Sequence, residues 1–380
     1  MLSREDAEAA DAVDPLHAFR DEFRMPDDVI YLDGNSLGPP STRVQIALER
    51  VQQQWAKDLV TGWDEWVDLP QRVGDRLGEA VLGAAAGQVV VCDSTTVNLH
   101  KLVAAARALR PDRSTIAVDR ASFPTDRYIV DGLGAQVREV DVGNVAEGLD
   151  DDVVAVVLSA VDYRTAARAD LVAATDAVHA AGALVLWDLS HAVGAVPLDL
   201  DATNVDLAVG CTYKYLNAGP GSPAFLYVRH DLQHVESPIP GWFGHADQFA
   251  MERRYRPADG IARFLAGTPN IPGTAAVAAG TELVHDAGIA RLRAKSAALT
   301  GLAIELADAA GFDVPTPREP ERRGAHVALR HSDAAALCVA LQRRGVITDH
   351  RPPDIIRLGF APLYTRFVDV WDAFERLATL

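Results

Sequence analysis

The stretch with the most chemical potential in this 380-residue chain is Cys211-Thr-Tyr-Lys-Tyr-Leu-Asn-Ala-Gly-Pro-Gly221. Lys214 follows a short apolar run, lies between two tyrosines, and precedes a glycine-rich turn whose backbone can approach a ligand closely. A single lysine is usually a solvated surface residue. A lysine amine that is partly desolvated among polar groups has a lowered pKa and can form an imine with an aldehyde. These neighbours make Lys214 the candidate nucleophile.

A second polar pair stands about 25 residues upstream, in Leu184-Val-Leu-Trp-Asp-Leu-Ser-His-Ala-Val-Gly194. Asp188 ends an apolar run, and His191 follows it by three residues. Ligands of open α/β sheets bind where buried strands end, so a carboxylate there could pair with a protonated pyridine nitrogen. Asp188 could instead cap the next turn and His191 could be a core histidine. The candidate lysine one strand later favours the ligand-binding interpretation.

A candidate anion site lies in Asp93-Ser-Thr-Thr-Val-Asn98, between an apolar run and a helical stretch. Hydroxyl and backbone N–H groups at a helix N-terminus can hold a phosphate, although an ordinary Ser/Thr cap has the same pattern. The chain contains no GxGxxG or GxxxxGK[ST] motif, which weakens nucleotide-binding alternatives.

Two weaker aromatic segments could complete such a site. In Ser122-Phe-Pro-Thr-Asp126, Phe123 could stack on a flat ring and Asp126 could reach it; otherwise the segment is a turn with a core Phe. In Gly241-Trp-Phe-Gly-His245, Trp242 could donate its indole N–H to a phosphate, or the segment is a buried hydrophobic loop.

The elements that would position these residues alternate between short apolar runs and helical stretches, with helices expected over Val97–Leu109 and Leu171–Ala181. The expected strands are Val89–Cys92, Thr115–Val118, Val153–Leu158, Leu184–Trp187, Leu207–Val209 and Phe225–Val228. Continuous Val/Leu runs are typical of strands buried on both faces, which predicts an α/β fold with a mostly parallel central sheet. The last two runs could instead form a hairpin across the Gly219-Pro220-Gly221 turn.

The pattern of the sequence changes after about Gly260, where a Pro/Gly-rich stretch precedes two more helical segments. The expected elements are helices over Thr274–Asp286 and Ile289–Ala310 and strands over His326–Leu329 and Ile355–Leu358. We therefore predict an N-terminal arm over residues 1–45, a large domain over 46–262 and a small α+β domain over 263–380.

Composition narrows the class of protein. The net charge of −17, from 53 acidic and 36 basic residues, argues against nucleic acid as a partner. The cysteines at 92, 211 and 338 form no CxxC pair, so neither a disulfide framework nor a metal site is expected. No apolar stretch long enough for a membrane span or a secretory signal occurs, and we expect a cytoplasmic protein.

Taken together, these segments resemble kynureninase, a family of fold-type-I pyridoxal-phosphate hydrolases. The matching strings are Tyr31-Leu-Asp-Gly-Asn-Ser-Leu-Gly38, Ser94-Thr-Thr-Val-Asn98, Phe123-Pro-Thr-Asp126, Val161-Asp-Tyr-Arg-Thr165, Asp188-Leu-Ser-His191, Tyr213-Lys-Tyr-Leu-Asn-Ala-Gly-Pro-Gly221, Gly241-Trp-Phe-Gly-His245 and Ile356-Arg-Leu-Gly-Phe-Ala-Pro-Leu-Tyr364. They occur in the family's order over nearly the whole chain, and the first and the sixth are the most specific.

The resemblance implies a large pyridoxal-phosphate-binding domain with a mostly parallel sheet, a smaller C-terminal domain, and a role for each matching residue. Lys214 would be the Schiff-base lysine and general base, Tyr213 would assist proton transfer, and Asp188 would pair with the pyridinium nitrogen. The implied cofactor contacts are Thr95, Thr96, Phe123, Asp126, Asp188, His191, Tyr213, Lys214, Trp242 and Thr268. Trp242 and Thr268 would come from the neighbouring subunit of a homodimer, although Asn270 competes with Thr268 for that polar role.

For the substrate, the resemblance implies that Arg357 clamps the α-carboxylate, that Asn35 and Ser36 line the pocket, and that Trp66 packs on the aryl ring. The implied reaction is hydrolysis of L-kynurenine to anthranilate and L-alanine, in tryptophan breakdown or NAD synthesis. 3-Hydroxykynurenine is an open second substrate, although a Trp at position 66 favours the unsubstituted ring. An aminotransferase, a cysteine desulfurase and a non-catalytic relative are the alternatives. For the desulfurase, Cys338 lies in an apolar helical stretch where a mobile cysteine is not expected.

Overall fold

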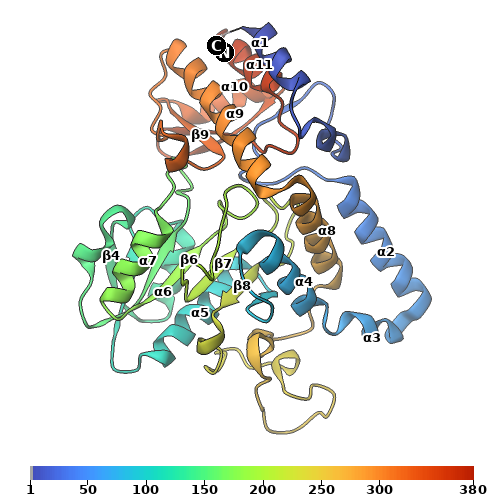
Figure 1. Ribbon diagram of the computed structural model, residues 1–380, viewed down its shortest axis with the longest axis vertical. Helices are drawn as coiled ribbons and strands as arrows, with labels where there is room; N and C mark the ends of the chain where they lie inside the picture. The colour runs from blue at the N-terminus through green and yellow to red at the C-terminus, as the bar shows by residue number, and fades with distance from the viewer. Residues whose placement is uncertain (1–2) are drawn as a thin grey trace.

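A computed structural model describes residues 3–380, and Figure 1 shows a large lower part and a smaller upper part. The large part is built on a seven-stranded sheet of order β2-β8-β7-β6-β5-β3-β4. Its strands are β2 (Val89–Val91), β3 (Thr115–Asp119), β4 (Gln136–Val140), β5 (Val153–Ser159), β6 (Leu184–Asp188), β7 (Leu207–Gly210) and β8 (Phe225–Val228). The predicted α/β fold with a mostly parallel central sheet is confirmed.

Strand β8 is the exception to the parallel arrangement. It pairs antiparallel with β7, with Gly210 opposite Phe225, and antiparallel with β2. The hairpin across the Gly219-Pro220-Gly221 turn, left open above, is therefore the observed connection. Strand β4 was not expected from the sequence, because it is an edge strand whose mostly polar residues Gln136–Val140 give no continuous apolar run.

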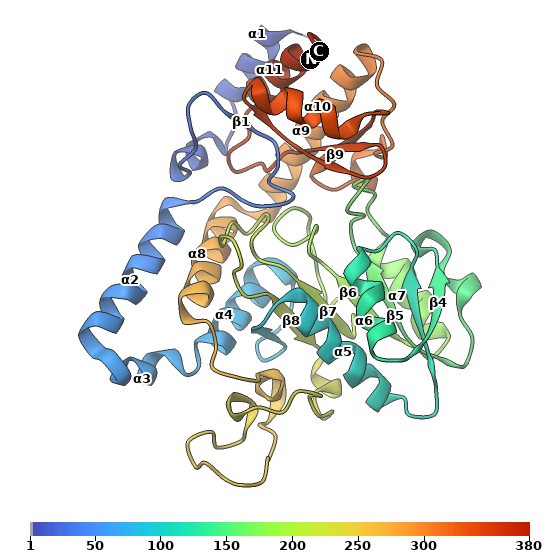
Figure 2. The same cartoon turned by 180° about the vertical axis from the view of Figure 1, so that it is seen from behind.

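Helices cover both faces of this sheet, which explains why its strands are apolar throughout. Within β6, Trp187 packs in one hydrophobic cluster and Leu186 in the other, on opposite faces. The helices of the large part are α2 (Thr42–Asp58), α3 (Trp63–Trp66), α4 (Leu69–Leu77), α5 (Thr95–Leu109), α6 (Pro124–Gly132), α7 (Leu171–Ala180) and α8 (Ile271–Ala287). Figure 2 shows α8 beside α2 and α4, with which it packs.

The upper part contains a three-stranded antiparallel sheet of order β11-β12-β9 with helices against it. Its elements are α9 (Ile289–Ala309), β9 (His326–Arg330), α10 (Ala334–Arg343), β10 (Val346–Ile347), β11 (Asp349–Arg351), β12 (Ile355–Gly359) and α11 (Phe367–Leu377). The N-terminal helix α1 (Arg4–Ala12) packs on α11, and β1 (Ile30–Tyr31) pairs with β10. Helices α1 and α11 lie together at the top of Figure 1. The domain boundaries at residues 45 and 262 stay predictions.

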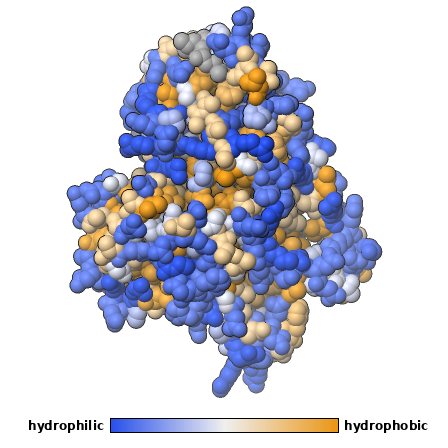
Figure 3. All heavy atoms as spheres, in the orientation of Figure 1, coloured by the Kyte–Doolittle hydropathy of each residue, from blue (hydrophilic) through white to orange (hydrophobic). Residues whose placement is uncertain are grey.

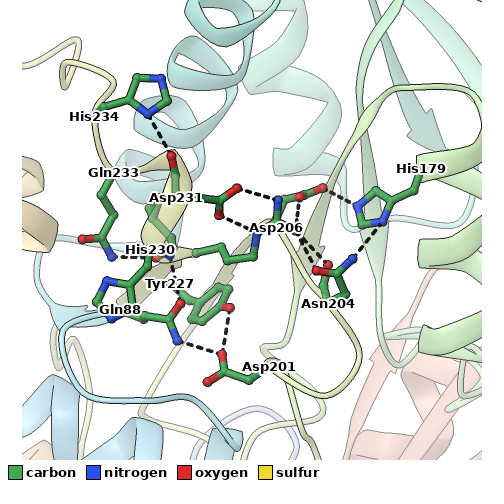
Figure 4. Close-up of polar contacts among 12 residues, drawn as sticks. Gln88, His179, Asp201, Asn204, Asp206, Tyr227, His230, Asp231, Gln233 and His234 are labelled. Atoms are coloured by element: carbon green, nitrogen blue, oxygen red, sulfur yellow. Dashed lines mark hydrogen bonds and ion pairs between the residues drawn. The ribbon is translucent and has the colours of Figure 1, made fainter.

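A network of hydrogen bonds and ion pairs connects residues of the large part near the N-terminal end of β7 (Figure 4). The carboxylate of Asp206, 1 % exposed, accepts the Val185 backbone N–H at 2.8 Å and lies 2.8 Å from both His179 Nε2 and Arg229 Nη1. Nearby, Asp201 accepts hydrogen bonds from the Gln88 amide and the Tyr227 hydroxyl. Because these carboxylates have protein partners, we interpret the network as structural.

Three simple properties complete the description of residues 3–380. All three cysteines are free and buried. No group of His, Cys, Asp and Glu side chains in the described chain is arranged to hold a metal ion. No helix among these residues is long and apolar enough to cross a membrane.

Candidate active site

The candidate site lies at one edge of the large sheet. Strands β2, β3, β5, β6 and β7 run in the same direction, so the loops that follow them meet at their carboxyl ends. A cavity of about 330 Å³ opens there. It is lined by Asn35, Ser36, Thr95, Thr96, Phe123, Thr125, Asp126, Tyr163, Asp188, Ser190, His191, Tyr213, Lys214, Arg351 and Arg357. All the residues predicted for the site lie here except Trp66, Trp242 and Thr268.

Lys214 is held at this edge by the tight loop that follows β7. Its carbonyl accepts the Asn217 N–H at 3.0 Å, and Asn217 takes a left-handed conformation with φ 55°. The Lys214 Nζ atom lies 2.8 Å from Nε2 of His191. Burial, followed by the charges of Lys214 and Arg357, lowers the pKa of His191 well below its usual value. His191 is therefore a neutral imidazole whose Nε2 can accept from the lysine.

Two carboxyl groups in the cavity have different environments. Asp188 ends β6, and its Oδ1 accepts the Ser190 N–H at 2.8 Å. Asp126 is 1 % exposed, and its Oδ2 has no hydrogen-bond partner in the described chain. Burial, followed by the charge of Asp188, raises the pKa of Asp126 well above its usual value. The raised pKa favours the protonated form of Asp126.

The candidate anion site forms the first turn of α5. Ser94 caps this helix by accepting the Val97 N–H at 3.3 Å, so Thr95 and Thr96 are its first two residues. The helix begins two residues earlier than expected and exposes free backbone N–H groups to an anion. The buried residue Lys101, which was not predicted from the sequence, contacts the residue that precedes this turn. Its Nζ lies 2.5 Å from both Asp93 Oδ2 and the Phe264 carbonyl oxygen.

Phe123 forms an aromatic wall of the cavity. Its ring is 44 % exposed and meets the ring of Tyr163 edge-on, with centroids 5.3 Å apart and planes at 87°. This contact leaves a face of Phe123 available to a flat ring. The predicted stacking role suits this position.

The two family-like strings at opposite ends of the chain meet beside Lys214. A Cβ added to Gly359 would come within 2.0 Å of Asn35 Oδ1, and a Cβ added to Gly34 would come within 2.1 Å of the Tyr364 hydroxyl. The Gly359 N–H also donates to the Leu32 carbonyl at 2.8 Å. Only glycine fits at these contacts, which explains why glycine lies in both strings.

Arg357 is fully buried and already heavily hydrogen-bonded. Its Nε donates to Asp349 Oδ1 at 2.7 Å, its Nη1 to the Tyr163 carbonyl at 2.6 Å, and its Nη2 to Ser36 Oγ at 3.0 Å and to Asp349 Oδ2. With its amide turned, Asn35 accepts from the same guanidinium at 3.3 Å. The carboxylate of Asp349 thus occupies the bidentate edge of the guanidinium that the resemblance assigns to the substrate.

Some residues of this site were missed by the sequence analysis. Asp349 and Arg351 alternate along β11, so both side chains lie on one face, and Arg357 is directly opposite Asp349 in the register. The charged alternation Asp-His-Arg before a Pro-Pro turn was the available signal. His326 is fully buried, neither ring nitrogen has a partner in the described chain, and its ring lies 5.6 Å from that of His191.

Three predicted residues do not line this chain's own cavity. Trp66 is buried in α3, where its Nε1 donates to Gln54 Oε1 at 2.8 Å, so it makes no wall of the cavity around Lys214. Trp242 is 38 % exposed and Thr268 is exposed, as expected of residues that would serve a neighbouring subunit. Asn270 caps α8 by accepting the Gly273 N–H at 3.0 Å.

The donor set of the cavity fits pyridoxal phosphate. The ring would find a carboxylate at Asp188, an aromatic face at Phe123 and an imine-forming amine at Lys214, while the helix N-terminus suits the phosphate. Two buried polar atoms that lack partners within residues 3–380, Asp126 Oδ2 and His191 Nδ1, point to a polar group that belongs in this space.

Comparison with solved structures supports this class. A cysteine desulfurase from Thermococcus onnurineus NA1 aligns with a TM-score of 0.81 and 16 % identity, covering 94 % of this chain and 96 % of that one. A C-DES variant with glycine covalently linked to its PLP cofactor aligns with a TM-score of 0.83 and 17 % identity, over 94 % and 98 %. The fold is that of the fold-type-I pyridoxal-phosphate enzymes, and the groups that line the cavity fit that cofactor.

Sequence relatives identify the family within this class. The kynureninase of Pseudomonas fluorescens is 44 % identical over 100 % of this chain and 96 % of its own length. The kynureninase of Burkholderia pseudomallei strain 1106a is 43 % identical over 99 % and 95 %. A family model described as the kynureninase C-terminal domain matches residues 292–377. The chain belongs to the kynureninase family.

Proposed function

We propose that this enzyme hydrolyses the Cβ–Cγ bond of L-kynurenine to release anthranilate and L-alanine, with pyridoxal phosphate as cofactor. The observation that carries the proposal is the meeting of Lys214, Asp188 and Arg357 at one cavity, although they come from both parts of the chain. The amine, the carboxylate and the guanidinium are the three groups that amino-acid chemistry on this cofactor needs.

Bound pyridoxal phosphate supplies an electron sink that weakens the bonds at the substrate's α-carbon. Lys214 is the base that removes the α-proton, since its Nζ lies in the cavity beside the neutral acceptor His191. Asp188 would pair with the protonated ring nitrogen, and the raised pKa of Asp126 favours a neutral acid in the same cavity.

Tyr213 lies next to Lys214 and lines the same cavity. The interaction with Cys211, followed by burial, raises the pKa of Tyr213, so its phenol keeps its proton at neutral pH. After water adds to the side-chain carbonyl and the Cβ–Cγ bond breaks, a proton must reach Cβ. Tyr213, acting through a water molecule, is positioned to deliver it.

The proposal includes a homodimer in the cytoplasm. Several large apolar side chains are exposed on α2, the turn after it and the 242–251 segment, among them Trp55 at 64 %, Phe249 at 59 % and Met251 at 69 %. Exposed apolar groups of this size commonly mark interfaces. In the view of Figure 3, hydrophobic side chains gather between the upper and lower parts of the molecule. A second subunit would bring its Trp242 and Thr268 to this cavity.

The experiment that tests the proposal is incubation of the holoenzyme with L-kynurenine, followed by anthranilate fluorescence and L-alanine analysis. The same reaction with a 2-oxo acid present distinguishes an aminotransferase, which would give kynurenic acid and no side-chain-derived alanine. Kinetics on 3-hydroxykynurenine compare the two substrates. A desulfurase is disfavoured because all three cysteines are buried, and burial raises the pKa of Cys338.

A further inference from the structure

The substrate end of the cavity contains two guanidinium groups that share one carboxylate. Arg357 Nη2 and Arg351 Nη2 both reach Asp349 Oδ2, the second at 2.9 Å. Ser36 Oγ donates to the same oxygen at 2.5 Å. The cross-strand pairing of β11 with β12 places these three charged side chains on one face of the hairpin.

The two arginines differ in how many N–H groups they have left. A guanidinium has five N–H donors. Arg357 uses its Nε, both Nη2 hydrogens and one Nη1 hydrogen on protein acceptors, so it retains one N–H. Within residues 3–380, Arg351 bonds only to its neighbour's carbonyl, that of His350, and to Asp349. It therefore retains three N–H groups.

The two arginine side chains also differ in their exposure to solvent. The side chain of Arg357 is 1 % exposed, whereas that of Arg351 is 30 % exposed and lines the cavity. A planar carboxylate is best bound by two parallel N–H groups. Arg357 has only one N–H left for such a contact, whereas Arg351 has more than one.

Charge balance also favours an anion at this position. Burial works to raise the pKa of Asp349, but the hydrogen bonds and charge of Arg357 outweigh it and lower the pKa, so Asp349 is ionised. One carboxylate against two guanidiniums leaves one positive charge. Burial, followed by Asp349, raises the pKa of the adjacent Asp33 to about 7, so Asp33 is partly neutral and does not cancel that charge fully.

From this geometry we infer that Arg351 is a second binding residue for the substrate α-carboxylate, and that Asp349 positions both guanidiniums for it. The inference rests on the proposed function for the identity of the substrate. Arg357 supplies one N–H and a buried positive charge, and Arg351 supplies the bidentate edge. Asp349 is a positioning residue, because it acts through the two arginines.

The test uses the holoenzyme and two small probes, L-alanine and ethylamine, which differ by the carboxylate. We expect Arg351→Gln to weaken L-alanine binding by about 10- to 100-fold, the range for a lost charged hydrogen bond, and to change ethylamine binding less than twofold. Arg351→Lys, which keeps the charge and the contact with Asp349, should fall between. The matched control is Arg330→Gln, an exposed arginine on β9 with its own partners Asp313 and Asp354.

With L-kynurenine, Arg351→Gln should raise KM by a similar factor and change kcat less than about threefold, while the affinity for pyridoxal phosphate stays unchanged. Unchanged L-alanine binding in both Arg351 variants would overturn the inference, as would equal weakening of L-alanine and ethylamine. Should the unaltered enzyme release no anthranilate, the proposed function fails, but the two-probe comparison still decides the role of Arg351.

Discussion

The Nζ atom of Lys214 lies 2.8 Å from Nε2 of His191, and the opposite ring nitrogen of His191 has no partner in the described chain. A lysine that donates to Nε2 requires the imidazole proton to be on Nδ1. His191 is thus held as a neutral acceptor against the reacting amine.

This contact predicts different outcomes for two substitutions of His191. His191→Gln keeps an acceptor oxygen within reach of Lys214 and should lower kcat/KM by about 10-fold. His191→Leu has no acceptor and should lower it by about 100-fold, because the lysine loses its hydrogen-bond partner in a buried site. Steady-state kinetics with both holoenzymes check this. Equal losses in the two variants would show that ring shape, not hydrogen bonding, is what matters.

The two carboxyl groups of the cavity should respond unequally to amide substitution. Burial and then Asp188 raise the pKa of Asp126 and favour its protonated form, so Asp126→Asn changes little chemically and should leave kcat within about threefold. Asp188→Asn removes the charge that faces the ring nitrogen and should lower kcat by at least about 100-fold. Single-turnover kinetics with saturating cofactor measure both. A larger loss in the Asp126 variant would reverse the assignment.

The neighbouring tyrosines provide a matched pair. Tyr213 lines the cavity and keeps its proton, so Tyr213→Phe should slow L-alanine release about 100-fold. The Tyr215 hydroxyl is buried without a partner among residues 3–380, so Tyr215→Phe should leave the rate nearly unchanged. Wild-type rate and full alanine yield in Tyr213→Phe would rule out the proton-relay role.

Stability should depend on pH through Asp33. Burial raises the pKa of its carboxyl to about 7 in the folded chain, against an unfolded value near 4. Between those values the folded state binds more protons than the unfolded state, so stability falls as pH rises from about 4 to 7. Asp33→Asn removes this loss.

Relative to the unaltered chain, Asp33→Asn should therefore gain roughly 2 to 4 kcal/mol of unfolding free energy between pH 5 and pH 8. Urea unfolding at the two pH values measures the difference, and the exposed Asp27→Asn is the control. The groups that face Asp33 are Ser36, Asp349, Arg351 and Arg357. A loss of unfolding free energy in Asp33→Asn would show that they keep Asp33 ionised.

The network around Asp206 should carry stability but no activity. Asp206→Asn removes the buried carboxylate that pairs with His179 and Arg229 (Figure 4). This substitution should lower the free energy of unfolding by about 3 kcal/mol. The control is Asp231→Asn, since Asp231 pairs with the same Arg229 but is 62 % exposed and should cost less than about 1 kcal/mol. Urea unfolding measures both, and a fall in kcat of the folded Asp206 variant would argue against a purely structural role.

Local patterns in the sequence predicted most of the fold and much of the candidate site. Continuous apolar runs in the sequence predict buried strands. The structure has strands at these runs, namely β3, β5, β6, β7 and β8. Because parallel strands place their carboxyl ends at one edge, Thr95, Asp126, Asp188 and Lys214 could be expected to meet. The edge strand β4 was not predicted, because its solvent-facing residues form no continuous apolar run.

Lys214, with which the sequence analysis began, was a candidate from its neighbours alone, and the sequence determined its place at the end of a buried strand. What only the tertiary structure decided is the set of groups that face it. His326, Asp349 and Arg351 come from the small sheet more than 100 residues later, and Trp66 lies outside this cavity in α3. Such contacts arise from packing between distant elements, where spacing along the chain carries no information about distance in space.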